Sequence, residues 1–86
     1  MTIEIEFAPI LEQKFFWEHL PLSLKDAIEK ERLSMYKSWF QLKPPVRDAL
    51  DYMTIPIIAP GGKTFQVSYA VRTVVRGTKV LVLHIY

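Results

Sequence analysis

The 86-residue sequence contains no cysteine, which excludes disulfide bridges and thiolate metal ligands. Two isolated histidines, His19 and His84, make a poor zinc set, so we predict no metal and no cofactor. No apolar run reaches the roughly 20 residues that a membrane-spanning helix needs. The N-terminus carries Glu4 and Glu6 where a secretory signal would carry basic residues, and we therefore predict a cytoplasmic protein without membrane contact.

Acidic residues are absent from the last third of the chain. Residues 52–86 contain no Asp or Glu, whereas residues 1–31 contain six Glu and one Asp against three Lys. The basic residues of this last third are Lys63, Arg72, Arg76 and Lys79. They indicate either a surface that faces a polyanion or a solvated sheet face whose cations protect the strand edges.

The length predicts that residues 1–86 form a single domain, because so short a chain cannot divide into two stable cores. Half of the residues are hydrophobic, which supplies enough apolar surface to offset the entropy of ordering the chain. At the N-terminus, Ile3, Ile5 and Phe7 alternate with polar residues, and this period of two predicts a half-buried strand.

Helical patterns occupy the middle of the chain. Pro9 suits a first helical turn, and an aromatic helix is predicted over Ile10–Leu20. Ser23 and Asp26 resemble a capping box that opens a longer helix, from Leu24 to about Leu42. Its predicted core face is Leu24, Ile28, Met35, Trp39 and Leu42. After Pro44-Pro45 a short further helix is predicted from the spacing of Val46, Ala49, Leu50 and Met53.

Strands return after these helices. Pro56 restricts the predicted strand Thr54–Ala59 to a sheet edge, because proline cannot donate a ladder hydrogen bond. A turn at 60–63 leads to an alternating strand from Thr64, and a reversal at Arg76–Thr78 leads to an apolar, central strand over Lys79–Tyr86. The predicted fold class is α+β: an N-terminal strand and two to three helices on one face of a small, mainly antiparallel sheet with a C-terminal hairpin.

The aromatic residues of the helical region allow two interpretations. Aromatic side chains at helical spacing usually form the core, but so many of them can exceed what a small domain covers, and an exposed excess would mark a protein interface. The set consists of Phe15, Phe16, Trp17, Tyr36, Trp39 and Phe40.

Catalytic motifs with known phosphate, acyl-transfer or zinc chemistry are absent from the sequence. The last strand nevertheless contains His84 and Tyr86, which are two residues apart and therefore share one face of a strand. An imidazole can act as an acid or a base, and Arg72 on the partner strand can supply positive charge to a phosphate. The other interpretation is a strand end that becomes polar where the core ends.

The segment 67–71, the following turn and the segment 80–86 resemble the YoeB branch of the RelE/ParE superfamily of bacterial toxins, which has a Val-Tyr-Ala-Val strand and a His-Tyr C-terminus. The resemblance implies cleavage of messenger RNA in the ribosomal A site and a small antitoxin that covers apolar surface. It matches Tyr86 to the terminal tyrosine of the family. Gln66 stands where the family has an arginine, which leaves Arg72 or Arg76 to supply that charge.

These features predict a RelE/ParE-like toxin, or a degenerate relative, that acts on ribosome-bound RNA if it is catalytic. The predicted catalytic residues are His84, Tyr86 and Arg72, and the predicted substrate-binding residues are Lys63, Arg76 and Lys79. The alternative is a non-enzymatic interaction module or a subunit of a larger complex. A nucleic-acid-binding domain without chemistry is the third possibility.

Overall fold

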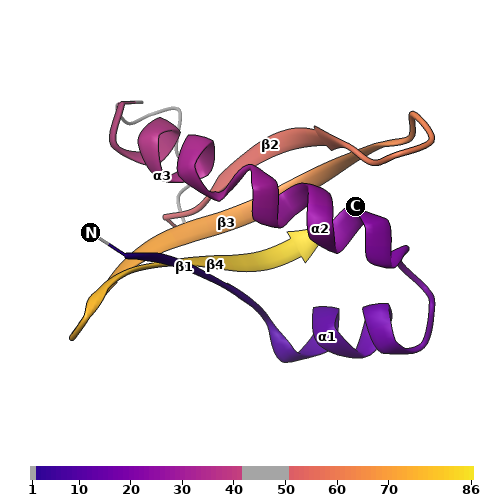
Figure 1. Cartoon of the computed structure of the whole chain (residues 1–86), viewed down its shortest axis with the longest axis horizontal. Coiled ribbons are helices and arrows are strands. Elements are labelled where there is room, and N and C mark those ends of the chain that lie inside the picture. Colours follow the sequence, from indigo (N-terminus) through magenta and orange to yellow (C-terminus); the bar gives the residue numbers. More distant parts are fainter. Residues whose placement is uncertain (1, 42–50) are drawn as a thin grey trace.

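A computed structural model describes residues 2–41 and 51–86, and within them it contains four strands and three helices (Figure 1). The predicted α+β fold is confirmed. In chain order the elements are β1 (Ile3–Phe7), α1 (Pro9–Phe16), α2 (Leu22–Lys30), α3 (Arg32–Gln41), β2 (Met53–Ile58), β3 (Thr64–Val74) and β4 (Gly77–Ile85). None of the described helices is long and apolar enough to cross a membrane.

The strands form one sheet in the order β1-β4-β3-β2. β1 runs parallel to β4, and the other two pairs are antiparallel. The prediction that β4 is central is confirmed, because it lies between β1 and β3. β2 is an edge strand, as Pro56 predicted, and the turn at 60–63 closes with a hydrogen bond from the Ala59 N–H to the Lys63 carbonyl.

The helices pack on one face of the sheet, and a single hydrophobic cluster joins the two layers (Figure 1). The predicted core residues Leu24, Ile28, Met35 and Trp39 are all buried. Tyr69 of β3 is fully buried, and its hydroxyl donates a 2.8 Å hydrogen bond to the Met35 carbonyl in α3. This bond ties the helical layer to the centre of the sheet.

The first helix is shorter than predicted. It ends at Phe16 instead of Leu20, because Glu18 adopts a left-handed conformation with φ of 64°. The Glu18 N–H then donates to the Phe15 carbonyl and the His19 N–H to the Lys14 carbonyl, the two bonds of a left-handed helix cap. Leu20 is buried behind this turn, while Phe16 and Trp17 remain exposed.

The second predicted helix is two helices. α2 begins at Leu22 after Pro21, and no side-chain hydrogen bond caps it, so the predicted Ser23–Asp26 capping box is wrong. At Glu31 the backbone has φ of −91° and ψ of 4°, and its N–H donates to the Ile28 carbonyl, which ends α2 before α3 starts. Leu42 and the helix predicted after Pro45 lie outside the described residues, except that Met53 opens β2.

The reversal before the last strand also differs from the prediction. Val74 pairs with Gly77, so Val75 and Arg76 form the turn and Gly77 already belongs to β4. Gly77 has φ of 141°, and a Cβ atom there would lie 2.6 Å from the Thr2 carbonyl oxygen. Two features therefore require glycine at position 77: the positive φ at the end of the turn and the close approach of the chain before β1.

Candidate functional site

A β-bulge in β4 decides which way the last residues of the chain point. Val82 pairs with Tyr69 and His84 pairs with Ser68, so Leu83 is an extra residue in the ladder. Strict alternation from the buried Val82 would turn His84 toward the helices. The bulge instead places His84 on the face without helices and sends Ile85 into the core.

Two small residues of β3 form the floor of this helix-free face. Ser68 and Ala70 are 0% and 1% exposed, although the described helices pack on the opposite face. Across β3, the rings of Tyr52 and His84 approach to 6.5 Å between centroids, and the Ser68 and Thr54 hydroxyls share a 2.8 Å hydrogen bond. Small side chains on the middle strand thus let rings from both flanking strands lie over it.

Tyr52, His84 and Tyr86 together form what we call the aromatic row. His84 and Tyr86 share one face, as their two-residue spacing predicted, and their rings stack with an interplanar angle of 23° and centroids 6.1 Å apart. Tyr86 is 70% exposed and His84 is exposed as well. The row offers open ring faces for stacking, together with an imidazole and a phenol that can exchange hydrogen bonds with a ligand.

Arg72 does not join the aromatic row. It pairs with Lys79, five residues before His84 along β4, which corresponds to a separation of roughly 15 Å. Lys79 itself forms a 3.5 Å ion pair with Glu6 of β1. The three predicted catalytic residues share one sheet face, but the structure brings together only His84 and Tyr86.

The predicted substrate-binding cations are divided between the two ends of the sheet. Lys63 lies in the turn before β3, where its ammonium group is 5.0 Å from the centre of the Phe65 ring. Arg76 lies in the turn after β3, and the 11 residues of that strand set the turns roughly 35 Å apart. Gln66, which the resemblance aligns with an arginine of the toxins, is hydrogen-bonded through its backbone to Tyr86, and the two arginines of the described strands and turns, Arg72 and Arg76, lie farther along β3.

Tyr52 is the member of the row that sequence reasoning missed. The signal for it was the pair Ser68 and Ala70, whose small side chains on a central strand leave room for rings from neighbouring strands. Nothing in the sequence specified which ring would fill that space. Among the described residues, no group of three or more His, Asp or Glu side chains is placed to hold a metal ion.

Comparisons with protein-family models, curated proteins and solved structures find no match to this chain. The resemblance to RelE/ParE toxins therefore stays a prediction that rests on the residues of the C-terminal hairpin.

Proposed function

We propose that this chain binds single-stranded RNA on the helix-free face of its sheet, as a RelE/ParE-like toxin or a degenerate relative. The observation that carries the proposal is the aromatic row above the small residues of β3. Unpaired bases stack on aromatic side chains, and a four-stranded sheet with helices on its other face is a common platform for this contact. Residues 52–86, which supply the row and the small residues beneath it, contain no acid that would repel phosphates, and Glu6 of β1 on the same face is paired with Lys79.

The arrangement of charge favours binding over cleavage. Phosphodiester cleavage needs positive charge at the scissile phosphate, next to the groups that transfer protons. Arg72 is roughly 15 Å from His84 along the strands, and Lys79 is paired with Glu6. The proposal places this binding in the cytoplasm and includes a protein antitoxin as a partner.

Fluorescence anisotropy with a labelled single-stranded RNA of ten nucleotides tests the proposal. Loss of one stacking ring costs about 1–3 kcal/mol per base, so Tyr86→Ala should weaken binding at least about fivefold. Tyr86→Phe keeps the ring and should bind like the parent chain. Equal affinity of Tyr86→Ala and the parent chain, or no measurable binding by the parent, would contradict the proposal.

Two further readouts define the mode of action. With one or two phosphate contacts, the logarithm of affinity should fall with the logarithm of salt at a slope of about −0.7 to −1.4, and a flat dependence counts against RNA binding. Induction in bacteria followed by mapping of RNA ends tests cleavage. New RNA ends that Tyr86→Phe abolishes would show that the phenol takes part in a reaction. Intact transcripts would show that the chain binds RNA without cleaving it.

A second candidate function, a protein-interaction module, is favoured by the exposed aromatic pair at the end of α1. Phe16 and Trp17 are 76% and 65% exposed, and their rings meet edge to face at 5.1 Å. Large aromatic side chains on a hydrogen-bonded turn are typical of interface anchors. This function does not exclude RNA binding, because the pair lies at the C-terminal end of α1 and the aromatic row lies on the sheet.

A further inference from the structure

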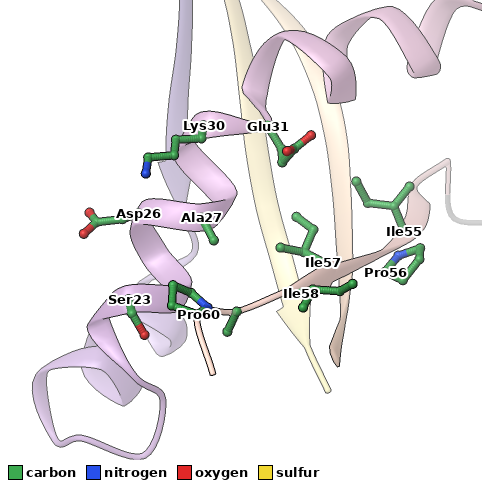
Figure 2. A pocket seen from close by; sticks show the side chains of 11 residues that line it. Ser23, Asp26, Ala27, Lys30, Glu31, Ile55, Pro56, Ile57, Ile58 and Pro60 are labelled. Atoms are coloured by element: carbon green, nitrogen blue, oxygen red, sulfur yellow. The ribbon is translucent and has the colours of Figure 1, made fainter. Parts of the chain in front are cut away.

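A groove with a volume of about 660 Å³ separates α2 from the edge strand β2 (Figure 2). Its strand side consists of the apolar residues between Ile55 and Pro60, and its helix side includes Ser23, Ala27 and Glu31. Figure 2 shows Ala27 pointing from α2 toward β2, on the side of the strand where Ile57 lies. The small side chain of Ala27 leaves space between α2 and β2. Because this alanine and the strand residues opposite it are apolar, the middle of the groove is apolar as well.

The charges around the groove are not equivalent. Figure 2 shows Asp26 and Lys30 pointing away from β2, whereas Glu31 lies on the strand side at the end of α2. Glu31 is exposed, and no ion pair or hydrogen bond of its side chain occurs within residues 2–41 and 51–86. An apolar groove with a carboxylate at one end is complementary to an apolar ligand that carries a positive charge.

The shape of the groove fits a polypeptide in extended conformation. From Ile55 to Pro60 the strand side measures about 17 Å, the length of five or six extended residues. The Ala59 N–H points into the hairpin, so the two-residue alternation turns the N–H groups of Thr54 and Ile58 to the free edge. Pro56, which lies between them, has no N–H group, so the free edge pairs less readily with any passing strand. Contacts with the side chains of the groove then select the partner.

We propose that this groove binds an extended apolar segment of a partner protein, with a lysine or arginine of that segment paired to Glu31. Alternate side chains of the segment enter the groove above Ala27, and its backbone bonds to the edge at Thr54 and Ile58. The site is independent of the aromatic row and goes beyond the RNA binding proposed above.

Amide chemical-shift titration of the whole chain with two six-residue peptides tests this site. Both peptides alternate valine and threonine, and one ends in lysine and the other in glutamate. The lysine peptide should shift the amide signals of Ala27 and Ile57 and bind more tightly by up to about fivefold, the upper end of what an exposed ion pair supplies. Shifts confined to other surfaces, or equal affinity of the two peptides, would overturn the proposal.

Variants test the Glu31 charge and the apolar groove as separate contributions to peptide binding. Glu31→Gln should remove the preference for lysine, while Asp26→Asn, whose side chain points away from β2, should retain it. Ala27→Leu should fill the groove and abolish the peptide-induced shifts at position 27 and at Ile57. If that variant does not fold, Ile55→Ser, at a half-buried position on the same face of β2 as Ile57, should weaken both peptides, and unchanged binding by it would refute the site. RNA affinity should be unchanged in Glu31→Gln, which distinguishes failure here from failure of the proposed function.

Discussion

A single residue with an unusual backbone conformation shapes the turn between α1 and α2. Glu18 ends α1 in the left-handed conformation that glycine adopts without steric cost. A residue with a Cβ atom is strained there by about 1–2 kcal/mol. The buried Leu20 that follows holds the turn in place, and the turn in turn fixes the positions of Phe16 and Trp17.

Glu18→Gly should therefore stabilise the protein by about 1 kcal/mol, because glycine relieves the left-handed strain at the cap. Urea denaturation followed by circular dichroism measures the change. Glu18→Ala is the matched control: it removes the carboxylate from the helix C-terminus but keeps the Cβ atom, so it should recover at most a few tenths of a kcal/mol. Equal stabilisation by both variants would attribute the effect to charge rather than to backbone strain.

Packing between elements depends on a few contacts that cross from helix to sheet. Tyr69 occupies the centre of β3, and its ring lies 6.1 Å from the Trp39 ring of α3. Its hydroxyl donates to the Met35 carbonyl, which is buried in the same helix. These contacts hold α3 against the sheet even though Glu31 breaks the helix that precedes it.

Tyr69→Phe should lower the free energy of unfolding by about 1–2 kcal/mol, because it leaves a buried carbonyl without the tyrosine donor. The matched control is Tyr86→Phe, since the Tyr86 side chain is 70% exposed and its hydroxyl is accessible to water. The control should unfold at the urea concentration of the parent chain. A Tyr69→Phe midpoint equal to that of the control would show that the hydrogen bond contributes no net stability.

At the scale of the whole molecule, the apolar surface is larger than the sheet and helices can cover. Within residues 2–41 and 51–86, the exposed large hydrophobic residues are Ile10, Phe16, Trp17, Leu22, Leu33, Phe40, Ile58, Val75 and Tyr86. Three of these residues, Phe16, Trp17 and Leu22, flank the turn at Glu18. Apolar residues gathered around a rigid turn are typical of a contact with another protein.

We expect the chain to associate as its concentration rises, because the exposed pair Phe16 and Trp17 gains burial only by contact with another molecule. Light scattering measures the mass, which is 10.1 kDa for one chain. Replacing both residues by serine should restore that mass at high concentration. Val75→Ser, at an isolated and fully exposed position, is the control and should change nothing. A parent chain that stays monomeric at every concentration would contradict this prediction.

Much of the fold was predictable because it depends on local patterns. The alternation of Ile3, Ile5 and Phe7 predicted β1, and Pro56 predicted that β2 lies at an edge. The helix limits were less predictable, because no residue type signals the left-handed Glu18 or the break at Glu31. Of the predicted site residues, the spacing of His84 and Tyr86 was enough to place both rings together.

The sequence by itself determined the α+β class, the core positions of the helices and the shared strand face of His84 and Tyr86, because periodicity and spacing act within single elements. Only the tertiary structure decided which face those rings occupy. The bulge at Leu83 reverses the alternation inherited from Val82, and such a shift arises from pairing with β3 rather than from β4 itself. The pairing register of β3 and β4 also places Arg72 opposite Lys79, far from the row. It places His84 opposite Ser68, where the Tyr52 ring reaches it across β3.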